Sequence, residues 1–182
     1  MSEKEMSLDG SLLLAAPSLR DGIFDRSVIL LANHSPHEGS LGLILNQPTG
    51  QEVGHLLTRP EFAGLEKIPV HVGGPVSPQQ LTFSAFWWNP TDGLHWQLQL
   101  PADEASRRAK QPGVLVRAHL GYSGWSAGQL EQELERHSWI TARPQANLLG
   151  KVHDRELWSD ILRSLSPFHR LLVDAPGDPS LN

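Results

Sequence analysis

The sequence contains no cysteine among its 182 residues. Disulfide bonds, thiolate catalysis, and zinc or iron–sulfur sites built from cysteine are therefore excluded. Long apolar runs are also missing, because segments such as 28–32 fall far short of the ~20 residues that a membrane-spanning helix needs. Residues 1–5 are polar and acidic and do not resemble a signal peptide. We expect a cytoplasmic protein that does not enter a membrane.

Basic residues are scarce as well: 15 Lys and Arg stand against 20 Asp and Glu, and the net charge is −5 at pH 7. Such a chain is poorly suited to a large phosphate-binding face. Its one basic cluster, Glu104 to Lys110, is explained by the solvent-facing side of a helix, and no helix-turn-helix pattern is present. We therefore do not expect direct DNA binding.

The composition is that of an ordinary globular protein, with 39% hydrophobic and 19% charged residues. A chain of 20.1 kDa buries roughly 70% of its unfolded surface, which is enough for a self-sufficient core. No repeat or linker divides the sequence. We expect one domain at 8–166, flanked by tails at 1–7 and 167–182.

Short apolar runs bounded by turn residues predict strands, and helical spacing of apolar residues predicts helices. The expected strands are 10–16, 26–32, 40–46, 70–76, 81–87, 94–100, 114–120 and 139–142. The expected helices are 102–110, 126–138 and 154–165, with a short helix capped by Thr49 and Glu52. Polar loops at 33–39 and 89–93 predict two antiparallel hairpins. Hairpins mixed with helices favour an α+β fold with a mixed sheet.

The stretch LGYSGWSAGQLEQEL, residues 120–134, places a serine in a glycine-rich segment between a predicted strand and a predicted helix. It resembles the G-x-S-x-G elbow of α/β hydrolases, but Trp125 replaces the second glycine and no histidine partner pattern follows Ser123. We favour a strand-to-helix corner plugged by Trp125, in which Ser126 and Gln129 form a capping box. A third interpretation, an anion at the helix N-terminus, lacks a nearby Lys or Arg.

Several segments carry a family resemblance: DGIFDRSV (21–28), NHSPHEGSLGLILNQP (33–48), VGGPV (72–76), the stretch 120–134, and SWITARP (138–144) with the helix around Trp158. In this order, between Leu8 and Leu165, they resemble the YqgE/AlgH family of bacterial proteins. The resemblance implies an α+β fold in which a mixed, largely antiparallel, branched sheet curls into a pseudo-barrel with flanking helices. The chain departs from the family pattern at Ser123, where relatives carry alanine, at the extra His37, and from Pro167 onward.

The shared motifs contain the residues that we expect to form a ligand or partner surface: Arg26, His34, Asn46, Gly73, Gly74, Tyr122, Trp125 and Gln129. Arg26 either pairs with Asp21, Asp25 or a helix carboxylate, or faces an anion at the mouth of a cleft. Asn46 either bonds a turn or contacts a ligand. The glycine pair is a β-bulge or a point of close backbone approach.

A metal site at His34, His37 and Glu38 would have three ligands, but the predicted loop does not fix their spacing. We expect His34 to hydrogen-bond the loop backbone, and we expect neither a metal nor a cofactor. The family has no established reaction, and its frequent description as a transcriptional regulator implies no DNA-contact residues.

The motifs are rich in glycine and packing residues and contain no evident set of acid, base and nucleophile. We therefore expect a non-enzymatic cytosolic protein with a binding or regulatory role, whose partner is an unknown protein or a small-molecule ligand. The alternatives are a small hydrolase or other enzyme that uses Ser123 or a His34-centred pocket, and a nucleic-acid binder.

Overall fold

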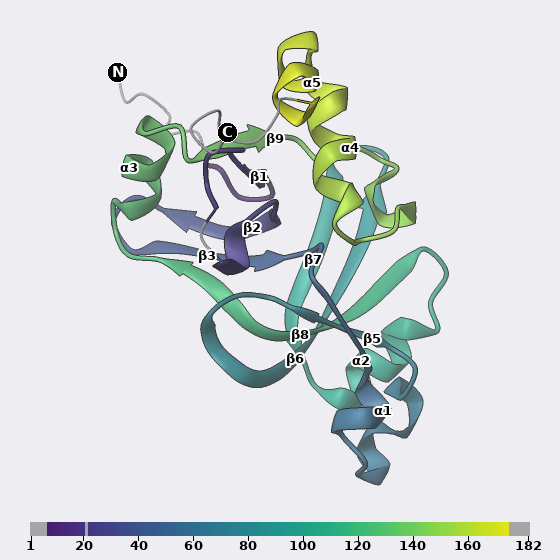
Figure 1. Ribbon diagram of the computed structural model, residues 1–182. Coiled ribbons are helices and arrows are strands. Elements are labelled where there is room, and N and C mark those ends of the chain that lie inside the picture. Colours follow the sequence, from purple (N-terminus) through teal and green to yellow (C-terminus); the bar gives the residue numbers. More distant parts are fainter. Residues whose placement is uncertain (1–6, 21, 175–182) are drawn as a thin grey trace.

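The structure, a computed structural model, describes residues 7–20 and 22–174 (Figure 1). Residues 1–6 of the expected N-terminal tail, Asp21, and residues 175–182 lie outside the described residues. Within the described ranges, no helix is both long enough and apolar enough to cross a membrane.

Strands make up most of the regular structure. In the described part of the chain they are β1 (Leu12–Ala15), β2 (Val28–Ser35), β3 (Gly39–Ile44), β4 (Pro48–Glu52), β5 (Pro69–Val72), β6 (Val76–Asn89), β7 (Gly93–Leu100), β8 (Val114–Trp125) and β9 (Trp139–Ala142). The first four residues of β2 are all buried, which agrees with their continuous apolar run. The hairpins β2–β3 and β6–β7 confirm the two that the polar loops predicted.

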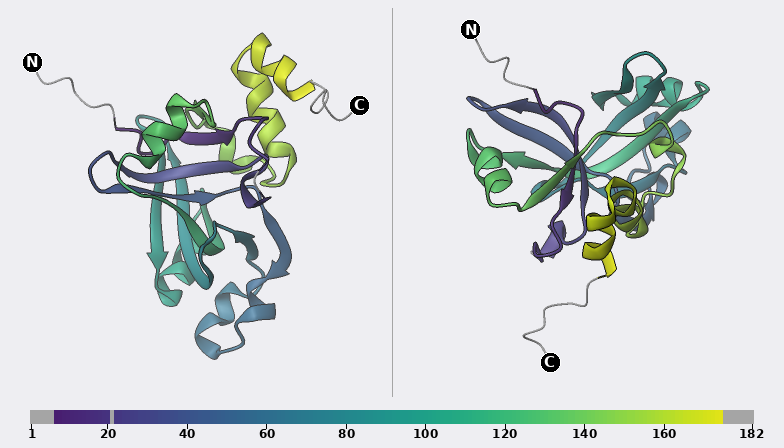
Figure 2. Two further views of the ribbon diagram at one scale, coloured as in Figure 1. Left: turned by 60° about the vertical axis from the view of Figure 1, so that its left-hand side comes forward. Right: turned by 90° about the horizontal axis from the view of Figure 1, so that it is seen from above.

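The strands form one branched sheet. Its main path runs β4-β5-β8-β3-β2-β1-β9, while β6 pairs with β8 and β7 pairs with β6. The pairing of β5 with β8 is parallel, and the other pairs are antiparallel. Seen from two further sides in Figure 2, the sheet curls into a half-barrel with helices around it. The expected α+β class and the mixed, largely antiparallel, branched sheet are confirmed.

Strand β8 is the branch point because successive parts of it have different neighbours. Residues 114–122 pair with β6, and residues 123–125 pair with β3, where Ser123 lies opposite Gly42. On its other side, residues 118–120 pair with β5. The sequence motifs that are far apart along the chain therefore meet along this one strand.

The predicted corner at Gly121–Trp125 is wrong, because β8 continues through these residues and the turn follows at Ser126–Gly128. Glycine at 121 indicates close packing inside the sheet here rather than a loop, with φ +70° and carbonyl groups of Gly74 and Val76 beside it. Helix α3 (Gln129–Glu135) then starts three residues later than predicted.

The other helices are α1 (Val53–Leu56), α2 (Ala102–Ala109), α4 (Glu156–Leu165) and α5 (Pro167–Asp174), with 3₁₀ helices η1 (Gly22–Phe24), η2 (Pro60–Leu65) and η3 (Leu148–Gly150). The predicted cap of α1 by Thr49 is wrong. Thr49 lies in β4 and its hydroxyl donates to the carbonyl of Val70, while the capping box is formed by Glu52 and His55. We expected no regular element after Pro167, but α5 continues the chain from α4 (Figure 1).

Helix α4 closes the apolar interior of the half-barrel on one side. Its buried residues are Leu157, Trp158 and Leu162, which share one face as the spacing predicted. The indole of Trp158 donates to the carbonyl of Ala15 at 2.9 Å, so that α4 is tied to the end of β1. Each fully buried leucine of this kind stabilises the fold by about 2 kcal/mol.

Candidate functional site

Ser123 sits at the centre of the glycine-rich signature, and its side chain is not available for chemistry. The residue is 0% exposed, and its hydroxyl donates to the carbonyl of Gly73 at 3.1 Å. The backbone of Gly74 passes so close to Tyr122 and Ser123 that a side chain on residue 74 would overlap them. Gly73 and Gly74 are therefore a close-approach site, as one of the two interpretations held.

His34 is also built into the fold. Its side chain is 5% exposed, its Nδ1 shares a hydrogen bond of 2.8 Å with the Ser40 hydroxyl, and its Nε2 lies 3.1 Å from Oε1 of Glu131. The expected bond of His34 to the loop backbone is wrong, because the imidazole links the β2–β3 hairpin to α3. Among residues 7–20 and 22–174, no three His, Asp or Glu side chains gather as a metal site would require.

A second carboxylate of α3 anchors two indoles. Oε2 of Glu133 accepts the Nε1–H of Trp125 at 2.7 Å and that of Trp139 at 3.3 Å. Both tryptophans are buried, and their rings pack edge to face with centroids 6.1 Å apart. Trp125 is thus a plug, as expected, but one whose polar atom has a charged partner.

Replacing Glu133 with alanine should lower the free energy of unfolding by about 2–3 kcal/mol, because two buried indole N–H groups would lose their acceptor. Glu133→Gln should lose less, since the amide oxygen can still accept. Urea unfolding followed by tryptophan fluorescence measures both changes. The exposed neighbour Glu135 supplies the control, and a loss at Glu135→Ala equal to that at Glu133→Ala would contradict this anchoring role.

Gln129 lies at the surface as the first residue of α3, and its side chain bonds to the turn before the helix. Its side-chain oxygen accepts the backbone N–H of Ser126 at 3.0 Å, which is one half of the predicted capping box. The other half, in which the Ser126 hydroxyl accepts the backbone N–H of Gln129, is wrong. That N–H donates to the backbone carbonyl of Ser126, and the Ser126 hydroxyl itself donates to the Gln129 side chain.

Arg26 and Asn46 line a common hollow of about 470 Å³. The residues that line it are Gly22, 25–27, 46–48 and 154–156. We call it the Arg26 hollow. It lies where the turn before β2, the end of β3 and the N-terminus of α4 come together. The side chain of Asn46 holds the base of this hollow in place. Its oxygen accepts the N–H of Val28 at 2.8 Å, and its NH₂ group donates to the carbonyl of Arg26 at 2.9 Å. Asn46 therefore binds a distant segment of the backbone, and not a turn of its own neighbours as one interpretation held.

Arg26 has an unusual backbone and an exposed side chain. Its φ of +54° lies in the left-handed region that non-glycine residues seldom occupy. Its guanidinium carbon lies 5.6 Å from the ring centre of Trp158. Within the described residues Arg26 forms no ion pair, and Asp25 is 3.6 Å from Arg155 instead. Pairing of Arg26 with Asp25 or with a helix carboxylate is therefore wrong, and the third suggested partner, Asp21, lies outside the described residues.

Ser27, next to Arg26, has a hydroxyl with no protein partner. The residue is 2% exposed, and its Oγ is buried without a hydrogen bond to any described residue. A buried hydroxyl in this state costs free energy comparable to a lost hydrogen bond. Ser27 was part of the family-like segment but was not among the predicted site residues.

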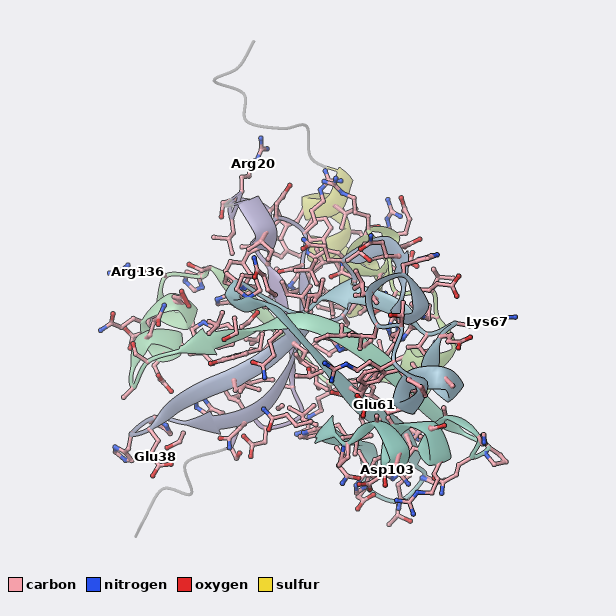
Figure 3. All side chains as sticks on the ribbon, turned by 90° about the horizontal axis from the view of Figure 1, so that it is seen from below. Arg20, Glu38, Glu61, Lys67, Asp103 and Arg136 are labelled. Atoms are coloured by element: carbon pink, nitrogen blue, oxygen red, sulfur yellow. The ribbon has the colours of Figure 1, made fainter. Side chains whose placement is uncertain are left out.

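Tyr122 and Trp125 line a different hollow, which is shallow and about 700 Å³ in volume. Trp96 and Leu98 of β7 form its opposite wall, and Glu38 belongs to its rim at the tip of the β2–β3 hairpin (Figure 3). The eight predicted site residues are thus divided: Arg26 and Asn46 meet in one place, Tyr122 and Trp125 in another, and the remaining four make contacts within the fold.

The sequence did not predict a group of three buried histidines. His71 of β5 lies opposite His119 of β8, and His153 precedes α4; all three are at most 5% exposed. Burial lowers the pKa of His71 to about 4 and that of His119 to about 3, and the charge of Arg117 adds to both effects. Burial also lowers the pKa of His153. The only sequence pattern that could have indicated this group is the pair Arg117 and His119, which are two positions apart in β8 and so lie on its inner face.

Comparison with known proteins places these features in a family context. The profile of the AlgH-like family matches residues 12–168. A UPF0301 protein of Parabacteroides distasonis is 33% identical over 188 residues, covering 97% of this chain and 92% of the relative. One from Streptomyces coelicolor is 35% identical over 188 residues and covers 97% and 96%.

Two solved structures share the fold. The solution structure of the AlgH protein from Pseudomonas aeruginosa has a TM-score of 0.70 at 25% identity, covering 98% of this chain and 99% of the other. The crystal structure of a protein from Corynebacterium diphtheriae has a TM-score of 0.69 at 26% identity and covers 94% of each chain.

Proposed function

This chain belongs to the AlgH-like family, and from that premise we propose that it is a non-enzymatic, cytoplasmic binding protein whose ligand site is the Arg26 hollow. The ligand class is a small polar molecule with an anionic group. A volume of about 470 Å³ suits such a molecule, because small-molecule sites commonly measure 300–1,000 Å³.

The observation that carries this proposal is the exposed side chain of Arg26, which lines the hollow and forms no ion pair within the described residues. A guanidinium that no carboxylate of the protein neutralises supplies the charge that recognises an anion. The left-handed backbone at Arg26 gives independent support. Strained residues of this kind tend to occur at functional sites, where the surrounding contacts hold them in place.

The charges around the hollow fit an anionic group on a polar ligand better than a bare polyanion. Asp25 is next to Arg155, and the side chain of Asp154 accepts the N–H of Glu156 at 2.9 Å. These carboxylates are thus engaged by groups of the protein itself, which leaves Arg26 as the available cation. The remaining carboxylate, Glu156, can accept from hydroxyl or amino groups on the same ligand.

The alternative of a hydrolase receives no support from the residues that suggested it. The hydroxyl of Ser123 donates to a backbone carbonyl in the interior, and both nitrogens of His34 face groups of the protein. A nucleophile must be reached by its substrate, and neither side chain has an open approach.

A binding panel of inorganic phosphate, glycerol phosphate and succinate tests the proposal by isothermal calorimetry. We expect at least one member to bind, and we expect Arg26→Gln to weaken its affinity by about tenfold or more, since the charged hydrogen bond is lost. Arg20→Gln is the matched control, because Arg20 is an exposed arginine outside the hollow (Figure 3). Equal losses in both variants would contradict the assignment.

Ser27→Ala should be more stable than the wild type without ligand by about 1 kcal/mol, because an unsatisfied buried hydroxyl is removed. Thermal unfolding without ligand measures this change. A destabilised Ser27→Ala protein would mean that the hydroxyl has a partner within the fold.

A further inference from the structure

Three buried nitrogen atoms without partners gather in the group around His119. They are Nε of Arg117, Nδ1 of His119 and Nδ1 of His71, each inaccessible to solvent and without a hydrogen bond to any described residue. Arg117 and His119 are two positions apart on β8 and so point to the same side of the sheet. The parallel pairing of β5 with β8 brings His71 alongside His119, with ring centroids 6.1 Å apart.

Two of these side chains, Arg117 and His119, face a small enclosed cavity away from the Arg26 hollow. Arg117, His119 and His153 line it, and the rest of its wall is apolar, including Leu30, Phe86 and Leu148. Its volume is about 10 Å³, which is room for one monatomic ion or one water molecule. Phosphates and carboxylates are too large for it.

The charge of this cavity is not balanced by the protein. The imidazoles are neutral, because burial lowers their pKa well below 7. Arg117 keeps its proton in proteins, and among residues 7–20 and 22–174 it forms no ion pair. A cation that is partly buried without an opposite charge is costly, so the site favours a species that brings a negative charge.

We propose that this cavity binds one monatomic anion, chloride, held by the Nε–H of Arg117 and a ring N–H of His119. The donors are N–H groups, which suit a halide, and the apolar walls exclude further water. A single water molecule would also fit, but it would leave the guanidinium charge unbalanced. The site would stabilise the crossing of β5, β6 and β8.

Crystals grown in sodium bromide test the occupant directly in the wild-type protein. We expect an anomalous bromide peak between Arg117 and His119. A water-sized peak with no anomalous signal at this position would overturn the proposal.

A solution measurement tests the same site without crystals. Chloride is added against gluconate at constant ionic strength, and the thermal midpoint is recorded. At a hundredfold excess over its dissociation constant, chloride should raise the midpoint by about 5–10 °C in a saturable way. Arg117→Met should abolish this rise, whereas Arg136→Met, at an exposed arginine just after α3, should retain it (Figure 3). Equal midpoints in chloride and gluconate would contradict chloride binding.

Discussion

Replacing Gly74 with alanine is expected to prevent stable folding, with a loss of more than about 4 kcal/mol in the free energy of unfolding. An added Cβ would overlap the backbone carbonyl of Tyr122 and the backbone nitrogen of Ser123. These are main-chain atoms of β8, and they cannot rotate away as a flexible side chain could. The strand that joins three parts of the sheet would have to move.

Gly150→Ala is the matched control for this prediction. A Cβ at Gly150 would meet no atom within 4 Å, and the residue has no positive φ. Its substitution should change the free energy of unfolding by less than about 0.5 kcal/mol. Urea unfolding monitored by far-UV circular dichroism and tryptophan fluorescence compares the two variants. If Gly74→Ala unfolds within 1 kcal/mol of the wild type, the close approach at β8 is wrong.

Acidification is expected to destabilise the protein strongly through its buried histidines. In the unfolded chain His71 and His119 take up protons around pH 6.5, whereas in the folded protein they do so only around pH 4 and pH 3. The unfolded state therefore binds more protons in this interval, so stability is complete above pH 6.5 and falls as the pH decreases. At pH 5 each histidine should cost about 2 kcal/mol, or about 4 kcal/mol together.

The measurement is the free energy of unfolding between pH 7.5 and pH 5 at fixed chloride concentration. His71→Gln and His119→Gln should each flatten the pH dependence, whatever their effect on stability at pH 7.5. His37→Ala, at an exposed position, should leave the slope unchanged. A wild-type protein that is equally stable at pH 5 and pH 7.5 would show that these imidazoles are not held neutral by burial.

The local elements could be predicted from the sequence because they depend on neighbouring residues. The apolar run in β2, the polar loop before β3 and the helical spacing in α4 all act over a few positions. The class of fold followed from these elements and from the family resemblance. The single domain at 8–166 stays a prediction.

The error at Gly121–Trp125 has a physical cause. Glycine both permits turns and allows backbones to approach, and a sequence does not distinguish the two uses. Here the approach of Gly74 to β8 decides the outcome, and it depends on residues far away along the chain. The same distance hid the histidine group, since His71 and His119 become neighbours only through the pairing of β5 with β8.

The candidate site could be predicted only in part, again because its residues are far apart along the chain. Arg26 and Asn46 were selected as members of separate motifs, and the hydrogen bond between the Asn46 amide and the Arg26 carbonyl joins them. The unpartnered hydroxyl of Ser27 could not be foreseen, because an unsatisfied hydroxyl is a property of its surroundings and not of the residue type.

Amide chemical-shift mapping of the wild-type protein tests the proposed binding function most directly. The ¹⁵N-labelled protein is titrated with inorganic phosphate, glycerol phosphate and succinate in turn. Saturable shifts concentrated at Gly22 and at residues 25–27, 46–47 and 154–156 are the predicted result for at least one of them. Shifts confined to the hollow around Tyr122, or no saturable shift with any of the three, would contradict the account.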